Sequence, residues 1–135
     1  MTPEQTELLK KAQDAAAMAY APYSGFHVGA AVLTDKGVFL GANIENACTN
    51  LGTCAERVAM ANARMNGATK IIGIAVNCVD AKPDDTGRIA QNTAMPCGAC
   101  RQWLAELAPE AWLVTNASDT VFQLADILPS AFILR

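Results

Sequence analysis

The amino-terminal part of the chain has apolar residues at helical spacing. They recur from residue 8 to residue 19 on one side of a helical period, which predicts an amphipathic helix. The preceding Thr2-Pro3-Glu4-Gln5 is typical of a helix start, because it offers an N-cap, a proline at the first helical position and a capping box. We expect this helix to end near Tyr20, because Ala21-Pro22-Tyr23-Ser24-Gly25 breaks the pattern.

Four short apolar segments predict strands, and three amphipathic segments predict further helices. The first two strands are separated by Asp35-Lys36-Gly37, which is typical of a hairpin turn. The third is apolar throughout, as expected for a strand covered on both faces. A polar stretch over residues 80–95 predicts a long loop. The predicted strands are residues 28–34, 38–43, 71–78 and 112–116, and the predicted helices are residues 54–66, 97–107 and 121–128.

The order of these elements predicts an α/β fold. A helix, two strands and then alternating helices and strands indicate a three-layer α/β/α sandwich with a mixed sheet. We expect an antiparallel hairpin to which the later strands add in parallel through right-handed crossovers. Two of the helices follow strands and begin with cysteines, and adjacent helix N-termini at strand ends are where a site is expected.

Length and composition limit the function classes. The 135 residues are enough for one domain, which we take as residues 1–135. The net charge of −3 and the lack of a basic run argue against nucleic-acid binding. No apolar stretch approaches the roughly 20 residues of a membrane span, and the polar amino terminus is unlike a secretory signal. Five cysteines, an odd number, favour a reducing cytoplasm over a disulfide framework.

Three of the cysteines and one glutamate form the pattern of a metal site. Cys97 and Cys100 have the Cys-x-x-Cys spacing with which two thiolates at a helix start hold one zinc ion. Cys54 is the candidate third ligand. Three protein ligands leave the fourth tetrahedral position open to water, as in catalytic zinc sites. Glu56 is well placed to contact that water, and the whole pattern resembles that of the zinc deaminases.

Zinc held by three thiolates carries a net charge of −1, which opposes ionisation of its water. Two helix N-termini, each with roughly half a positive charge, would offset that charge. Arg57 and Arg101 lie next to ligands in the sequence and are expected to donate to the thiolate sulfurs. Glu56 would then carry the proton from the water to the substrate. The expected reaction is hydrolytic deamination of a cytosine-type ring, with one zinc per chain.

Five motifs, in order along nearly the whole chain, resemble the small cytidine deaminases that act on free nucleosides. The resemblance implies their fold, with a mixed five-stranded sheet, and the deamination of cytidine or deoxycytidine in pyrimidine salvage. It also implies a homotetramer with sites completed by neighbouring subunits; a homodimer is the alternative. The motifs are Pro22-Tyr23-Ser24-Gly25-Phe26-His27-Val28-Gly29-Ala30-Ala31, Asn43-Ile44-Glu45-Asn46-Ala47, Cys54-Ala55-Glu56-Arg57, Pro96-Cys97-Gly98-Ala99-Cys100-Arg101-Gln102 and Leu128-Pro129-Ser130-Ala131-Phe132.

The resemblance also assigns substrate contacts. Asn43 and Glu45 match residues that bind the ribose hydroxyls, Phe26 and Phe132 match walls of the base pocket, and the Ala55 backbone N–H would touch the pyrimidine. The chain departs from the family pattern in two places. Thr49 stands where an aromatic residue is usual, and the loop over residues 80–95 is longer than the usual connection.

Other interpretations of these residues remain open. Cys97 and Cys100 could be a redox pair or half of a closed zinc knot, and Cys48 could be a fourth zinc ligand. Cys78 is expected in the core, and His27, the only histidine, at the surface. Arg57 and Arg101 could be ordinary surface charges, Asn43 and Glu45 could serve only the local backbone, and Phe26 and Phe132 could be core residues.

Two other functions also remain open. The same chemistry could act on another aminopyrimidine, such as a modified cytosine nucleoside or a blasticidin-type antibiotic. A structural zinc module that binds nucleic acid is the alternative from a different class. It would need four protein ligands and a basic face.

Overall fold

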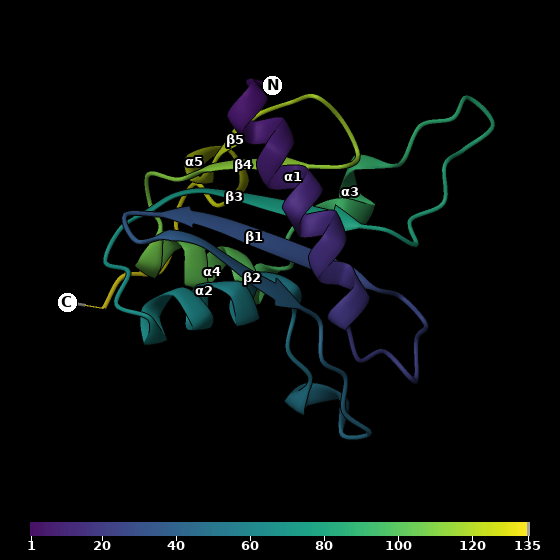
Figure 1. The fold of residues 1–135 in the computed structure, drawn as a ribbon, viewed down its shortest axis with the longest axis horizontal. Coiled ribbons are helices and arrows are strands. Elements are labelled where there is room, and N and C mark those ends of the chain that lie inside the picture. The colour runs from purple at the N-terminus through teal and green to yellow at the C-terminus, as the bar shows by residue number, and fades with distance from the viewer. Residues whose placement is uncertain (135) are drawn as a thin grey trace.

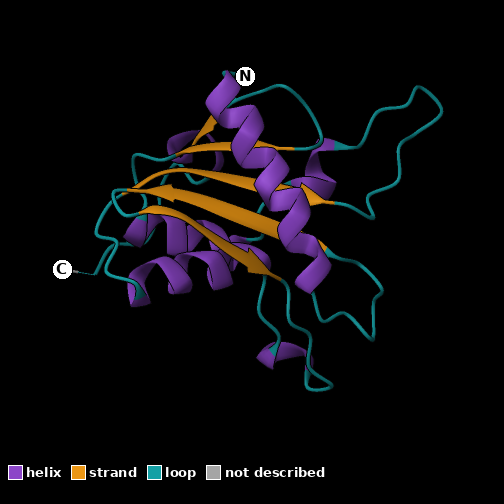
Figure 2. Ribbon diagram, in the orientation of Figure 1, coloured by secondary structure: helices purple, strands orange, loops and turns teal. Residues whose placement is uncertain are grey.

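A five-stranded sheet forms the middle of the molecule, in a computed structural model that describes residues 1–134 (Figure 2). The strand order is β2-β1-β3-β4-β5. The strands are β1 (Val28–Thr34), β2 (Gly37–Ala42), β3 (Ile71–Cys78), β4 (Trp112–Thr115) and β5 (Phe122–Gln123). The α-helices are α1 (Pro3–Ala15), α2 (Ala55–Met65), α3 (Gln91–Ala94), α4 (Gly98–Leu107) and α5 (Leu124–Ile127). Short 3₁₀ turns cover Ala16–Met18 and Thr49–Leu51.

Helices cover both faces of this sheet. Figure 1 shows α1 crossing one face, while α2 and α4 lie side by side on the other. The three-layer α/β/α prediction is therefore confirmed. The capping box at the start of α1 is present as predicted, because Thr2 Oγ1 accepts from Gln5 N at 3.2 Å and Gln5 Oε1 accepts from Thr2 N at 2.9 Å. Helix α1 itself ends at Ala15, earlier than the predicted Tyr20.

The sheet is mixed, as predicted, but one predicted pairing is wrong. Strand β3 pairs antiparallel with β1 and not parallel to it, whereas β4 does pair parallel with β3. The path of the crossover explains this pairing. The chain leaves β2 through α2 and passes over β1, so β3 has the same direction as β2 and runs antiparallel to its neighbour β1. The predicted helix over residues 121–128 begins as β5, which pairs antiparallel with β4 and supplies the fifth strand. The long loop contains the short helix α3.

Two glycines let helices approach the sheet closely. A Cβ on Gly29 would lie 1.8 Å from the Ala12 carbonyl oxygen of α1. A Cβ on Gly41 would lie 2.4 Å from the Ala55 carbonyl oxygen and 2.3 Å from the Ala59 nitrogen of α2. Atoms cannot approach so closely, so any side chain at Gly41 would push away the first turn of α2.

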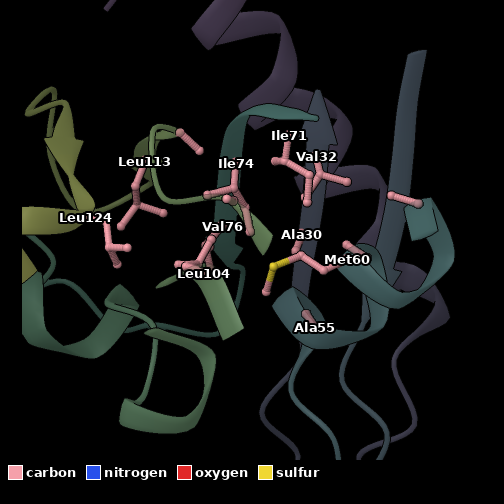
Figure 3. Packing of buried hydrophobic residues seen from close by; sticks show 14 of the residues in the cluster. Ala30, Val32, Ala55, Met60, Ile71, Ile74, Val76, Leu104, Leu113 and Leu124 are labelled. Atoms are coloured by element: carbon pink, nitrogen blue, oxygen red, sulfur yellow. The ribbon is translucent and has the colours of Figure 1, made fainter. Parts of the chain in front are cut away.

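The larger core lies between the sheet and the α2/α4 layer, as Figure 3 shows. Its largest wholly buried side chains include Val32, Met60, Ile74 and Val76. Burying each such side chain contributes about 1.5–3 kcal/mol relative to leaving it in water. This packing fixes α2 and α4 against the same strands, and so fixes the position of their N-termini. Within residues 1–134, no helix has both the length and the apolar character needed to cross a membrane.

Candidate metal centre and active site

The N-termini of α2 and α4 bring three cysteines together. Cys54 is the N-cap of α2 and Cys97 is the N-cap of α4, both with extended backbone, and Cys100 lies in the first turn of α4. The sulfurs of Cys54 and Cys97 are 3.7 Å apart, and those of Cys97 and Cys100 are 3.6 Å apart. All three sulfurs lie within 4.8 Å of one another. The structure therefore groups the three residues that the sequence predicted as ligands.

The spacing of these sulfurs fits one zinc ion. Two sulfurs bound to the same tetrahedral zinc at about 2.3 Å lie roughly 3.8 Å apart. The separations of 3.7 Å and 3.6 Å are close to that value. Within residues 1–134, Cys48 does not belong to the cluster, and its sulfur instead donates to Asn50 Oδ1 at 2.9 Å. Three ligands make an open site, so the alternatives of a closed zinc knot and of a four-ligand structural module lose their basis.

The surroundings of the cluster favour a thiolate at Cys54. Hydrogen bonding from Cys100, followed by that from Arg57 and Cys97, lowers the pKa of Cys54 to about 5. The same interaction with Cys54 raises the pKa of Cys100. Arg57 Nη2 donates to the Cys54 sulfur at 3.4 Å, as predicted, and this thiolate raises the pKa of Arg57. The cluster thus has a cation in direct contact, in addition to two helix N-termini.

Arg101 has a different role from the predicted one. Its Nε donates to the Pro96 carbonyl at 2.8 Å and its Nη1 to the Ile127 carbonyl at 2.7 Å. The prediction that Arg101 donates to a thiolate sulfur therefore has no support in the described contacts. Arg101 instead joins the residue before Cys97 to the end of α5. It stabilises the backbone that presents the ligands.

Glu56 is buried beside the sulfurs. Its side chain is 4% exposed, although it lies in the first turn of α2 only two residues after Cys54. Burial raises the pKa of Glu56 to about 7, and the nearby negative charge of Cys54 adds to this rise. A carboxyl group with a pKa near neutrality can both accept and donate a proton. This is the property expected of a proton carrier.

A cavity of about 320 Å³ opens over Glu56, Cys54 and Cys97. Its walls come from the start of β1, the end of β3 and the segment that enters α4. Two of the predicted substrate-binding residues, Phe26 and Ala55, line the cavity. The cavity is lined by Ser24, Phe26, Val28, Asn43, Glu45, Cys54, Ala55, Glu56, Val76, Cys78, Thr93, Ala94, Met95 and Cys97.

A second cavity of about 530 Å³ adjoins the first. Both are lined by Ser24, Asn43, Glu45 and Cys54. Thr49, Thr53 and Arg57 line the second cavity, so Thr49 shares a cavity with the candidate ligand Cys54. The smaller cavity is a mostly apolar chamber beside Glu56, and the larger one adjoins it.

Asn43 and Glu45 line both cavities and also stabilise the backbone around them. Asn43 Oδ1 accepts from Val28 N at 2.9 Å, and Asn43 Nδ2 donates to the Phe26 carbonyl at 2.8 Å. Glu45 accepts from the backbone N–H groups of Tyr23 and Ser24 and from the Ser24 hydroxyl. The Ser24 hydroxyl is the main reason why the pKa of Glu45 is lowered, so Glu45 is a carboxylate.

The structure places one predicted substrate-binding residue, Phe132, away from the two cavities of its own chain. Its side chain is 70% exposed, and it lines neither of the two cavities described above. Its carbonyl accepts from Gln102 Nε2 at 2.9 Å. The sequence, in contrast, gave no signal for the cavity residues Cys78 and Met95. Cys78 is buried, as predicted for a core residue, but it also forms part of the cavity wall.

Comparison with known proteins identifies the family. The model of the cytidine and deoxycytidylate deaminase zinc-binding region matches residues 2–116. The chain belongs to this family. It is 41% identical to a cytidine deaminase of Halalkalibacterium halodurans over 130 residues, which are 93% of this chain and 91% of that protein. It is 38% identical to a cytidine deaminase of Mycobacterium tuberculosis over 122 residues, which are 90% of this chain and 84% of that protein.

Solved structures of cytidine deaminases share the fold. The cytidine deaminase of Burkholderia pseudomallei superposes with a TM-score of 0.78 at 39% identity, covering 98% of this chain and 100% of that one. The M. tuberculosis enzyme superposes with a TM-score of 0.79 at 36% identity, covering 98% and 100%. The fold predicted from the sequence is therefore that of the cytidine deaminases. The three-sulfur cluster matches the zinc-binding character of the family and fits one zinc ion per chain.

Substitution of single cysteines tests the ligand set of this family member. We expect Cys54→Ser, Cys97→Ser and Cys100→Ser each to lose most of the bound zinc, because each removes one of three ligands. Cys48→Ser is the matched control and should keep one zinc per chain, since its sulfur is outside the cluster. Zinc content measured by atomic absorption on purified protein decides between the outcomes. If Cys48→Ser loses metal as fully as Cys97→Ser, the three-ligand site is wrong.

Proposed function

We propose that the protein hydrolyses cytidine and deoxycytidine to uridine and deoxyuridine with release of ammonia. One observation carries this proposal: the buried Glu56 lines the same cavity as Cys54 and Cys97, two of the three clustered cysteines. The cavity holds an acid–base group next to a metal site, which is what hydrolytic deamination requires. The names of the relatives support cytidine as the substrate. We assign this activity to a single domain spanning residues 1–135.

Glu56 carries the proton in this reaction. When bound, zinc supplies a Lewis acid that lowers the pKa of a water at the site. Glu56 takes one proton from this water and gives it to the ring nitrogen next to C4, while the water oxygen bonds to C4. Glu56 then passes the second water proton to the amine, the bond between C4 and the amine nitrogen breaks, and ammonia leaves. One water is consumed, and no oxidant or reductant is needed.

The residues around the cavity would position the nucleoside. Phe26 forms an apolar wall for the ring, and the Ala55 backbone N–H, at the start of α2, would donate to the pyrimidine. Glu45 is a carboxylate with lone pairs beyond those used by its three donors, so it would accept from a ribose hydroxyl. Asn43 would reach the same ribose with its remaining amide hydrogen. Arg57 would stay on the thiolate of Cys54 and offset its charge.

Replacement of Glu56 tests the proposed proton transfer. Glu56→Ala and Glu56→Gln should fold, keep one zinc per chain and bind a pyrimidine nucleoside, because neither change removes a ligand. Turnover of cytidine should fall by at least ~10²–10⁴-fold, the usual contribution of a positioned proton-transfer group. Ammonia release, measured with zinc content for the three proteins, gives the answer. A Glu56→Gln variant as fast as an active wild type would remove Glu56 from the mechanism.

We also propose that the protein is a homotetramer in which Phe132 serves a neighbouring subunit. Several apolar side chains are exposed in the single chain, including Met18 at 81%, Leu51 at 65% and Phe132 at 70%. Their exposure supports a surface that another subunit covers. Such side chains are typical of association surfaces when they gather in patches. Phe132, which does not line the described cavities of its own chain, would then pack over the base in a neighbour's site.

Light scattering tests the assembly. We expect the mass of the active protein at micromolar concentration to be four times that of the 14.2 kDa chain. Phe132→Ala should weaken nucleoside binding only if its ring reaches a site in the assembled protein. A stable monomer with full activity would contradict the tetramer and the proposed role of Phe132 together.

We place the enzyme in the cytoplasm, in the salvage of pyrimidine nucleosides. All five cysteines are free thiols in the structure. A site built from three reduced thiols is best maintained in a reducing compartment. Free nucleosides, rather than nucleic acid, fit the net charge of −3.

A further inference from the structure

The single histidine forms a close pair with the first acidic residue of the long loop. Asp80 Oδ2 accepts from the His27 backbone N–H at 2.7 Å and lies 2.6 Å from His27 Nδ1. The His27 backbone N–H is the main reason why the pKa of Asp80 is lowered, so Asp80 is a carboxylate and only accepts. The proton between the two side chains therefore belongs to Nδ1. The sequence predicted His27 at the surface, and both side chains are indeed 41% exposed.

This pair lies where two walls of the 320 Å³ cavity meet. His27 is flanked by Phe26 and Val28, and Asp80 comes two residues after Cys78. Phe26, Val28 and Cys78 all line the cavity, and Val28 is paired with Cys78 between β1 and β3. The backbone joins the walls at the same place, because Val79 N donates to the His27 carbonyl at 3.2 Å. A carboxylate that accepts two hydrogen bonds from one residue holds that residue in a single orientation.

The Cys78 end of β3 is also fixed from its other sides. Asn116 holds the Cys78 backbone like a neighbouring strand, with its Oδ1 accepting from Cys78 N at 3.0 Å and its Nδ2 donating to the Cys78 carbonyl at 3.1 Å. The Cys78 sulfur donates to the Thr93 carbonyl at 3.7 Å, where the long loop returns to the cavity. The contact of Asp80 with His27 joins this rigid wall to the segment that carries Phe26.

We propose that Asp80 is a positioning residue for the substrate: through His27 it joins the segment that carries Phe26 to the end of β3, so that Phe26 stays in place on the cavity wall. This role rests on the proposed deamination of cytidine. Asp80 touches none of the three sulfurs and does not line the cavity itself, within the described contacts. Its effect is on the fit of the ring and not on zinc or on proton transfer by Glu56.

A wall that is held in place before binding lowers the cost of ordering it around the ligand. When the wall is no longer held in place, the substrate and the transition state both bind more weakly by a similar amount. KM therefore rises, and kcat stays nearly unchanged. A loss of fold or of metal would instead lower the active fraction and therefore kcat. The separation of KM from kcat thus distinguishes positioning from a general structural role.

The test compares four variants of the zinc-loaded full-length protein in steady-state deamination of cytidine. We expect Asp80→Ala to raise KM about three- to tenfold, the loss typical of an ordinary hydrogen bond, with kcat within about twofold of wild type. Asp80→Asn should be close to wild type, because its amide oxygen still accepts from both His27 groups. His27→Ala removes only the ring contact and should raise KM by a smaller factor, about twofold or more.

Asp84→Ala is the matched control in the same loop. Asp84 accepts from Thr86 N, from the Thr86 hydroxyl and from Arg88 N, all within the tip of the loop. Its loss should leave KM unchanged, since none of these residues lines the cavity in the described structure. Zinc content and thermal unfolding, measured for every variant, check that each protein is folded and loaded.

Two results would overturn the role of Asp80. One is an unchanged KM in both Asp80→Ala and His27→Ala. The other is a rise in KM for Asp84→Ala as large as that for Asp80→Ala, because the loop as a whole would then be responsible. A wild type that is zinc-loaded but does not deaminate cytidine would contradict the proposed function itself, and is recognised before any variant is compared.

Discussion

The convergence of two helix N-termini at one end of the sheet is the constraint on which the site depends. Cys54 begins α2 and Cys97 begins α4, so both ligands lie where each helix presents roughly half a positive charge. This arrangement, together with Arg57, accompanies the grouping of three cysteine sulfurs in one small volume. The convergence in turn depends on close packing, because the backbone of α2 at Ala55 and Ala59 rests directly on Gly41 of β2.

The same packing determines the chemistry of Glu56. Because the first turn of α2 is pressed against the sheet, a side chain two residues after an accessible ligand becomes almost completely buried. Burial raises the pKa of Glu56 to about 7, and the ligand charge acts in the same direction. One contact between a helix and a strand therefore places a metal ligand and tunes an acid–base group. The ligand position and the proton affinity of Glu56 are consequences of the same geometry.

Local patterns in the sequence predicted the features that depend on nearby residues. The capping box of α1, the hairpin of β1 and β2, and the ligand spacing of Cys97 and Cys100 were all visible in this way. Contacts between distant segments were not. The antiparallel pairing of β3 with β1, the use of Arg101 on two carbonyls and the contact of His27 with Asp80 each depend on how the chain crosses the sheet. Phe132 carried a family signal, but the single chain does not bring it to its own cavity.

We expect three protein sulfurs to hold zinc and to leave one coordination position open. X-ray absorption at the zinc edge, measured on the zinc-loaded protein, counts these ligands directly, because sulfur scatters more strongly and lies farther from zinc than oxygen or nitrogen. Our account predicts three sulfur ligands and one light ligand, with the light ligand changing when a pyrimidine nucleoside is added. Four sulfur ligands, unaffected by nucleoside, would show a closed site and contradict the account.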